Sequence, residues 1–262
     1  MKKHITHIAR TRIIHAAFAF AFALLLSPTP PAFAQARECA ATQAEPQLSM
    51  KTREVSVTWW KRHAELVARA QAGGFDIMFL GDSITQRWET DGKEVWAKKL
   101  APLGAKPFGI SGDRTENLLW RLRWGQLGGK CNPRLVVMMI GTNNTGHRMD
   151  APADIATGVR ACIDEIQKRK PDAKILLLAI FPRGADSSDK QRLNNEAANK
   201  LIRAFADGQK VFYADIGAVF LTKEGVLEKS VMPDLLHPAA AGYELWADAV
   251  IPEIQKILPD KR

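Results

Sequence analysis

The sequence predicts an α/β protein, a three-layer α/β/α sandwich with a central parallel sheet. Two observations carry this prediction. Short apolar runs recur along the chain, and a longer segment with apolar residues at helical spacing follows each of them. The runs are apolar at consecutive positions, as expected for strands buried on both faces. Strands that alternate with helices form a parallel sheet covered by helices on both sides.

The expected elements can be placed by residue number. A first helix is expected over 57–72, because its apolar residues have helical spacing and Gly73-Gly74 is an end signal. Strands are expected over 77–80, 107–110, 135–140, 175–181 and 211–214. Further helices are expected near 94–100, 115–125, 152–170, 189–208 and 238–258. No repeat or linker divides this region, so one domain is expected over 57–262, preceded by a polar surface segment over 35–56.

Residues 1–34 have the pattern of a secretory signal peptide. Four basic residues precede an apolar run over 13–26, and Ala32-Phe33-Ala34 resembles a cleavage site. The run is too short for a stable membrane anchor, so we expect a secreted or periplasmic protein that is cleaved near Ala34. A retained anchor is the alternative interpretation.

The charge of the remaining chain argues against a nucleic-acid partner. The first 34 residues hold four of the 37 Lys and Arg residues and none of the 28 Asp and Glu residues, so their removal lowers the formal net charge from +9 to +5. The remaining basic residues are interspersed with acidic ones, whereas binding to phosphates needs a concentrated positive face. No Cys and His cluster suggests a zinc site, so neither a metal nor another cofactor is expected.

Four loops at one edge of the expected sheet are rich in glycine and polar residues. Ligands of open parallel sheets bind beyond the carboxyl ends of the strands. Three loops follow strands and one precedes the last helix: Gly81-Asp82-Ser83-Ile84-Thr85, Gly109-Ile110-Ser111-Gly112-Asp113, Gly141-Thr142-Asn143-Asn144 and Asp234-Leu235-Leu236-His237-Pro238.

These loops hold a candidate for each role in ester hydrolysis by a serine. Ser83 stands where a helix begins, so its backbone N–H is free to bind an anion. Asp234 lies three residues before His237 and can orient its ring, so that the other ring nitrogen accepts the proton of Ser83. The N–H groups of Ser83 and Gly112 and the amide of Asn143 are the expected oxyanion donors. Each loop alone is more typical of a turn or helix cap, but their joint occurrence favours a catalytic site.

The four loops resemble the blocks of the SGNH hydrolases, the GDSL-type esterase and lipase superfamily, over most of residues 57–258. The blocks supply a serine, a glycine, an asparagine and a histidine, which match Ser83, Gly112, Asn143 and His237. Within the superfamily, the chain is most similar to the platelet-activating-factor acetylhydrolase IB catalytic-subunit type and its bacterial relatives. This likeness lies in Gly112-Asp113-Arg114-Thr115, Leu119-Trp120-Arg121-Leu122, Gly141-Thr142-Asn143-Asn144-Thr145-Gly146-His147 and Phe181-Pro182-Arg183-Gly184.

Two departures limit what the resemblance implies. Asn144 stands where many superfamily members have Asp, although this subgroup shares the Asn. The signal peptide is unlike the cytosolic mammalian members, so their substrate is not carried over. The α/β-hydrolase elbow Gly-x-Ser-x-Gly is incomplete here, because Thr85 occupies the second glycine position.

The resemblance implies a serine ester hydrolase that forms an acyl-enzyme, either an acetylesterase or a lysophospholipase-like acylhydrolase. We expect a short acyl group, acetyl first, on an acetylated carbohydrate, which can be a polysaccharide, or on a glycerophospholipid. A non-catalytic carbohydrate- or anion-binding module is the alternative. Further candidates for substrate contact are Asp82, Trp120, His147 and Arg183. The alternatives are a helix cap for Asp82, core packing for Trp120, a surface loop position for His147, which is the preferred interpretation there, and an exposed loop charge for Arg183.

The cysteines allow one disulfide after export. Cys162 has helical spacing with Val159 and Ile166, which predicts a buried free thiol in the core. Cys39 and Cys131 lie in expected loops, and they are the predicted disulfide pair.

Overall fold

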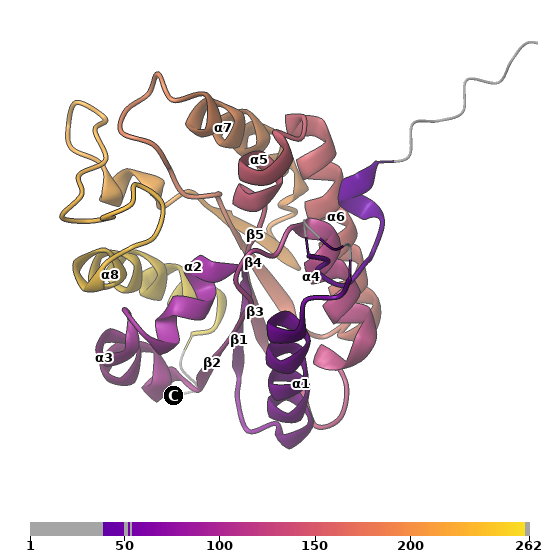
Figure 1. Cartoon of the computed structure of the whole chain (residues 1–262). Helices are drawn as coiled ribbons and strands as arrows, with labels where there is room; N and C mark the ends of the chain where they lie inside the picture. The colour runs from indigo at the N-terminus through magenta and orange to yellow at the C-terminus, as the bar shows by residue number, and fades with distance from the viewer. Residues whose placement is uncertain (1–38, 50–51, 53, 260–262) are drawn as a thin grey trace, which may run out of the picture. The chain divides into compact units, whose positions relative to one another are not determined.

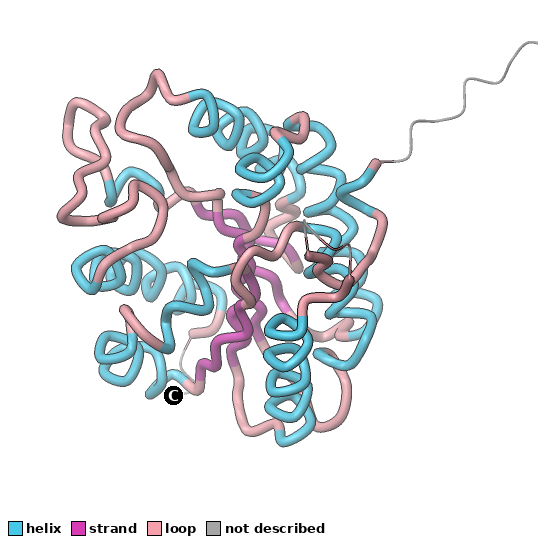
Figure 2. The backbone as a smooth tube through the Cα atoms, in the orientation of Figure 1, coloured by secondary structure: helices cyan, strands magenta, loops and turns pink. Residues whose placement is uncertain are grey.

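Five parallel strands form the central sheet. Figures 1 and 2 show the strands at the centre of the domain, surrounded by helices. The computed structural model describes residues 39–49, 52 and 54–259; the predicted signal peptide over 1–34 lies outside them. The strands are β1 (Ile77–Gly81), β2 (Ala105–Gly109), β3 (Leu135–Met139), β4 (Lys174–Leu178) and β5 (Val211–Ala214). Their order in the sheet is β2-β1-β3-β4-β5, so the chain reverses its direction of progress between β1 and β3. Ligand sites of such sheets lie at this switch point.

Helices cover both faces of the sheet (Figure 1). One face carries α1 (Val57–Ala72), α4 (Thr115–Arg121), α6 (Pro152–Arg169) and α7 (Lys190–Ile202). The other face carries α2 (Ser83–Gln86), α3 (Lys93–Val95) and α8 (Ala240–Ile257). A further helix, α5 (Thr142–Arg148), follows β3 and packs against α7. Single turns and π segments complete the described elements: η1 (Ala40–Thr42), η2 (Arg87–Glu89), η3 (Trp96–Leu100), η4 (Ala101–Leu103), η5 (Leu122–Gln126), η6 (Arg203–Phe205) and η7 (Gly217–Phe220).

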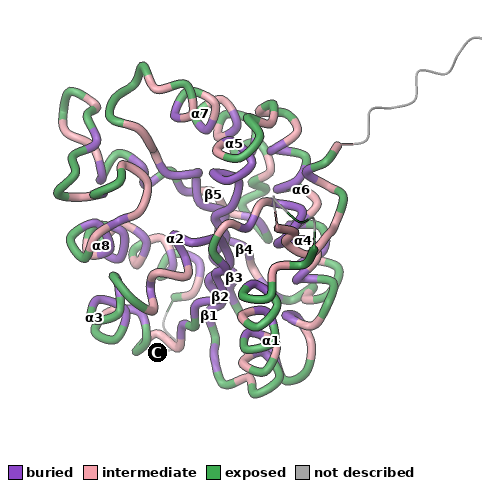
Figure 3. The backbone as a smooth tube through the Cα atoms, viewed as in Figure 1, coloured by how far each residue is buried: buried purple, intermediate pink, exposed green. Residues whose placement is uncertain are grey.

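Two hydrophobic cores lie on opposite faces of the sheet. Successive side chains of a strand point to opposite faces. Met78 and Leu80 of β1 therefore pack with α1, α4 and α6, while Ile77 and Phe79 pack with α8. Figure 3 shows the buried strands at the centre and exposed residues on the outer helix faces. Within the described residues, no helix has the length and apolar content needed to cross a bilayer.

The α/β/α architecture expected from the sequence is confirmed. The first helix over 57–72 and the last strand over 211–214 lie at the predicted residues. The loop expected after β3 is wrong, because residues 142–148 form α5. The expected helix over 94–100 begins as a single α-helical turn and continues as the π segment η3.

The described part of the segment before α1 packs on the domain. Ala41 is buried, and its carbonyl accepts a hydrogen bond from Thr115 Oγ1 at 2.9 Å. The Glu45 carbonyl accepts one from Asn117 Nδ2 at 3.1 Å. These bonds fix the segment to the first turn of α4, the element that follows the second of the four polar loops.

The predicted Cys39–Cys131 disulfide is wrong, because all three cysteines are free. Cys39 Sγ lies 3.7 Å from the Asp154 carbonyl, at the start of α6. Cys131 lies beside Lys170, at the other end of the same helix. An 18-residue helix is about 27 Å long, far beyond the reach of a disulfide. The prediction for Cys162 is confirmed: the thiol is free and fully buried among core residues.

Candidate active site

Ser83, His237 and Asp234 are joined by two hydrogen bonds. Ser83 Oγ lies 2.9 Å from His237 Nε2, and His237 Nδ1 lies 2.6 Å from Asp234 Oδ2. The order of atoms is the one a base needs to take a proton from a serine while a carboxylate orients its ring. Ser83 is 7% exposed, and the His237 side chain is 14% exposed. The pair is therefore shielded but open to a ligand from one side.

The end of β1 positions Ser83 at the first residue of α2. Asp82 is the N-cap of α2, and its Oδ1 accepts a hydrogen bond from the Ile84 N–H at 3.0 Å. Gly109, at the end of β2, permits α2 to pack this closely, since a Cβ there would lie 2.3 Å from the Gln86 nitrogen. At the start of a helix the Ser83 N–H has no partner four residues earlier. It is thus a free donor beside its own hydroxyl.

A strained turn brings Asp234 and His237 together. Asp234 Oδ1 accepts hydrogen bonds from the N–H groups of Leu236 (3.1 Å) and His237 (2.7 Å). Leu235 between them has a φ of 57°, a conformation that costs a non-glycine residue on the order of 1–3 kcal/mol. Its carbonyl accepts a 2.9 Å hydrogen bond from the Gly184 N–H, which holds the turn against the loop after β4.

The Asp234 carboxylate is favoured in its ionised form. Partial burial acts to raise its pKa, but the hydrogen bonds from the His237 ring and backbone outweigh this effect and hold the pKa below its usual value. An ionised carboxylate can orient the neutral ring and stabilise the imidazolium that forms when the ring takes a proton.

The loop after β2 presents Gly112 with a left-handed φ of 79°. Hydrogen bonds hold its neighbours: the Ser111 N–H donates to Gln86 Oε1 at 2.6 Å, and the Ser111 carbonyl accepts from Gln47 Nε2 at 3.1 Å. A Cβ on residue 112 would lie 2.6 Å from Gln47 Nε2, so the Gln47 amide occupies the space next to Gly112. Among the described residues, the Gly112 N–H has no hydrogen-bond acceptor.

Asn143 lies in the first turn of α5 and contacts the same loop. Its Nδ2 donates a 3.0 Å hydrogen bond to the Asp113 carbonyl, which uses one of the two amide protons. The second proton remains as a donor. Asn143 is 6% exposed. The structure thus brings Asn143 to the Gly112 loop, as the sequence predicts.

Asp113 holds this loop to the ends of β1 and β2. Its carboxylate accepts from Trp59 Nε1 and Arg121 Nε, both at 2.6 Å. Arg121 also donates to the carbonyls of Gly81 and Phe108, both at 3.0 Å. Burial raises the pKa of Asp113 to about 6, against the opposing effect of the Arg121 charge. This buried pair ties both loops to one rigid support.

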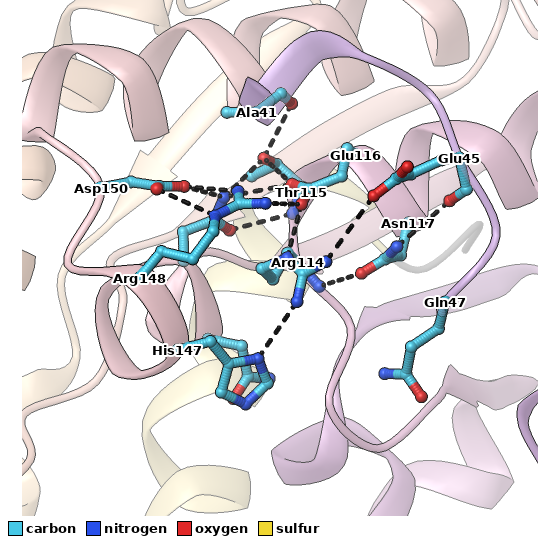
Figure 4. Close-up of polar contacts among 12 residues, drawn as sticks. Ala41, Glu45, Gln47, Arg114, Thr115, Glu116, Asn117, His147, Arg148 and Asp150 are labelled. Carbon is cyan, nitrogen blue, oxygen red and sulfur yellow. Dashed lines mark hydrogen bonds and ion pairs between the residues drawn. The ribbon is translucent and has the colours of Figure 1, made fainter. Parts of the chain in front are cut away.

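A second polar network joins the starts of α4 and α5 (Figure 4). Asn144 accepts from the Thr115 N–H at 3.0 Å and donates to Glu116 Oε2 (3.3 Å) and Asp150 Oδ2 (3.0 Å). Arg148 pairs with the same two carboxylates, at 2.7 and 2.6 Å. A neutral donor is needed between two carboxylates, which explains asparagine at the position where many superfamily members carry aspartate.

The other predicted substrate contacts lie in different surroundings. Asp82 is 1% exposed, and its Oδ2 has no hydrogen-bond partner among the described residues. Burial raises the pKa of Asp82 to about 7. Arg183 Nη1 donates to the Thr142 carbonyl at 3.0 Å, next to Asn143. Trp120 packs against Trp59 and His63, away from Ser83, with ring centroids 5.5 and 5.1 Å apart. A substrate contact by any of these side chains stays a prediction.

His147 is exposed on α5, not in a loop as the sequence suggested. Its Nδ1 lies 3.3 Å from Arg114 Nη1 (Figure 4). Although the residue is exposed, part of the ring is covered, and this partial burial together with the nearby arginine charges lowers the pKa of His147. The neutral ring can therefore accept a hydrogen bond from Arg114, and its contact with substrate likewise stays a prediction.

Sequence reasoning missed Gln47 and Gln86. Both are amide side chains that bind the backbone of Ser111, and they come from segments far apart in the chain. No motif marks either residue, so only the fold reveals them. Within the described ranges, no group of three or more His, Cys, Asp or Glu side chains is placed to hold a metal ion.

Comparison with known proteins places the chain among esterases. Residues 79–245 match the model of the GDSL-like Lipase/Acylhydrolase family. The platelet-activating factor acetylhydrolase IB subunit alpha1 of Bos taurus is 32% identical over 186 residues, which cover 71% of this chain and 77% of the bovine protein.

Solved structures share the fold. A GDSL-like lipase from Bacteroides thetaiotaomicron has a TM-score of 0.63 at 21% identity, covering 76% of this chain and 98% of the lipase. An acetylxylan esterase from Geobacillus stearothermophilus has a TM-score of 0.56 at 20% identity, covering 71% of this chain and 96% of the esterase. The predicted superfamily and enzyme class are confirmed: the chain belongs to the GDSL-like lipase/acylhydrolase family and is a carboxylic ester hydrolase.

Proposed function

We propose that Ser83, His237 and Asp234 are the catalytic triad of this esterase. The observation that carries the proposal is the continuous pair of hydrogen bonds from Ser83 Oγ through the His237 ring to Asp234 Oδ2, at 2.9 and 2.6 Å. Ser83 Oγ attacks the ester carbonyl while His237 Nε2 accepts its proton. The Oγ–carbon bond forms as the carbonyl π bond opens, which leaves a tetrahedral oxyanion.

The oxyanion is bound by the N–H groups of Ser83 and Gly112 and by the second amide proton of Asn143. Support for these roles comes from the free N–H groups and from the hydrogen bonds that hold their neighbours in place. Donors fixed in advance need no reorganisation as charge develops, and one such donor lowers the activation barrier by about 2.7–4 kcal/mol. When the tetrahedral intermediate collapses, the carbonyl re-forms and the bond between the carbonyl carbon and the alcohol oxygen breaks. The leaving alcohol takes the proton from His237. Water then releases the acid from Ser83 by the same steps.

The acyl group is short, with acetyl first. Polar amide side chains contact the Gly112 loop: Gln47 lies next to Gly112, and Gln86 accepts a hydrogen bond from the Ser111 N–H. Each methylene of a long chain that finds no apolar surface forfeits about 0.8 kcal/mol. The similar bovine protein is an acetylhydrolase by name, and the neighbour from Geobacillus stearothermophilus is an acetylxylan esterase, which supports the acetyl assignment.

The alcohol part is an acetylated carbohydrate or a glycerophospholipid, and the protein works outside the cytoplasm. The name of the neighbour from Geobacillus stearothermophilus, an acetylxylan esterase, supports the carbohydrate, and the glycerophospholipid is the second class to test. The basic start, apolar run and small residues of 1–34 support export.

Hydrolysis of p-nitrophenyl acetate tests the triad. Wild-type protein is compared with Ser83→Ala, His237→Ala and Asp234→Asn, and circular dichroism checks that each variant folds. We expect all three variants to lose most of kcat. If Ser83→Ala is as active as the wild type, the triad proposal is wrong.

A panel of p-nitrophenyl esters from two to sixteen carbons tests the acyl group separately. We expect kcat/KM to be highest for acetyl and to fall beyond butyryl. Rates that rise with chain length would refute the short-acyl proposal and leave the triad standing. Release of acetate from acetylated xylan or from an acetylated glycerophospholipid then identifies the alcohol part.

A further inference from the structure

Four of the seven tryptophans gather on one side of the domain, outside the catalytic residues. Trp59 and Trp60 lie on α1, Trp120 on α4 and Trp124 on η5. Three of them form a continuous row, because the ring centroids of Trp60 and Trp120 are 5.6 Å apart and those of Trp120 and Trp124 are 6.1 Å apart.

The outer rings of this row face solvent. Trp60 is 49% exposed and Trp124 is 62% exposed, whereas Trp88, Trp96 and Trp246 are at most 8% exposed. Large indole rings contribute most when they are buried, and grouped exposed apolar side chains mark interaction surfaces. The row is therefore available for a ligand.

The surface beside the row is concave and carries positive charge. Trp120 and Trp124 line a cavity of about 620 Å³ together with Arg123, Lys168, Arg169 and Glu165. Glu165 pairs with Arg123 at 3.4 Å and with Arg169. Lys168 is exposed and has no ion-pair partner among the residues described. Three cations against one carboxylate leave the cavity positively charged.

We propose that this cavity binds an acidic polysaccharide, with sugar rings packed on Trp120 and Trp124 and a uronate carboxylate held by Lys168 and Arg123. The C–H face of a sugar ring is complementary to the electron-rich face of an indole. Arg and Lys bind carboxylates through charge-assisted hydrogen bonds. Exposed indole rings beside three cations suit a chain that presents ring faces and carboxylates together, which favours an acidic glycan over an anionic membrane.

The row is connected to the candidate active site. Trp59 packs on Trp120 with centroids 5.5 Å apart, and its Nε1 donates to Asp113 Oδ1 at 2.6 Å. Asp113 directly follows Gly112. A polymer held in the cavity thus lies on the side of the molecule from which the Gly112 loop is supported. As a substrate-docking site the cavity rests on the proposed function, but binding itself does not need catalysis.

Binding of polygalacturonate tests the proposal without turnover. Affinity electrophoresis and calorimetry compare wild type with Trp124→Ala and Lys168→Glu. The control variant is Leu201→Ala, which removes an exposed apolar side chain from α7. We expect retardation of wild type and Leu201→Ala, at least tenfold weaker binding by Trp124→Ala and Lys168→Glu, and binding that weakens with added salt. Hydrolysis of p-nitrophenyl acetate should be the same in all four proteins.

Three results would overturn the proposal: no binding of polygalacturonate, equal binding by the wild type and Trp124→Ala, or equally strong binding of neutral dextran. Binding of phosphatidylglycerol vesicles without binding of polygalacturonate would assign the cavity to lipid and also reject it. Failure of the triad leaves each of these readouts unchanged, so the two proposals fail separately.

Discussion

Replacing Asp82 by asparagine should stabilise the protein at neutral and alkaline pH. Asp82 is 1% exposed, and its Oδ2 has no hydrogen-bond partner among the described residues, while Oδ1 caps α2. A buried carboxylate without a partner is costly to ionise. Asparagine keeps the shape and the capping oxygen but carries no charge, so the variant removes this cost.

The magnitude follows from the pKa. Burial raises the pKa of Asp82 from 3.8 to about 7. Well below pH 3.8 the carboxyl is protonated in both the folded and the unfolded state, so the two states bind equal numbers of protons. Between pH 4 and 7 the folded state keeps a proton that the unfolded state has lost, and stability falls as pH rises. The full cost above pH 7 is about 4 kcal/mol, at about 1.4 kcal/mol per pKa unit.

Thermal unfolding at pH 4.5 and pH 8 measures this effect. For a domain of this size, about 4 kcal/mol corresponds to a Tm shift on the order of 10 °C. We expect the Tm of Asp82→Asn to exceed that of the wild type by that amount at pH 8 and by about a quarter of it at pH 4.5. Other titrating groups are shared by both proteins and cancel in the difference. The exposed Asp172→Asn is the matched control, and a Tm difference for Asp82→Asn that is equal at both pH values would refute the reasoning.

Three further substitutions test the loops around Ser83. Asn143→Ala should lower kcat for p-nitrophenyl acetate by about 10²–10³ with little change in KM, because it removes one oxyanion donor; a loss confined to KM would contradict that role. Gln47→Ala should lower kcat by about 3- to 10-fold, which corresponds to the free energy of the one hydrogen bond lost to the Ser111 carbonyl. An unchanged kcat would show that the Gly112 loop keeps its conformation without Gln47. Asn144→Asp should lower stability by about 1–3 kcal/mol, more at pH 8 than at pH 5, because it adds a carboxylate beside Glu116 and Asp150; an unchanged melting temperature would argue against the network.

The parts of the fold that sequence could predict are those with strong apolar periodicity. The helix over 57–72 combines an apolar stripe with a glycine end, and most strand positions are apolar, as in β1. The helix α5 was missed because Thr142-Asn143-Asn144-Thr145-Gly146 consists of poor helix formers. Tertiary contacts hold it instead, such as the hydrogen bond from Thr145 Oγ1 to Asn195 Oδ1 at 2.7 Å.

The candidate site was predictable where the residues themselves are chemically distinctive. Ser83, Gly112 and Asn143 follow strand ends, which the parallel sheet brings together, and His237 precedes the last helix with an Asp three residues before it. Gln47 gives no such signal, because its position depends on how a polar segment packs on α4. The disulfide prediction was wrong for the same reason, because positions in loops do not reveal that Cys39 and Cys131 lie at opposite ends of α6.

Covalent labelling of Ser83 tests the central claim most directly. A fluorophosphonate reacts with a serine Oγ whose proton a neighbouring base removes, and peptide mass spectrometry locates the phosphonate. Wild type, Ser83→Ala and His237→Ala are treated for the same time. The triad proposal predicts one label, on Ser83 of the wild type, and none within that time on either variant. A label on another residue, or labelling of His237→Ala as fast as the wild type, would contradict it.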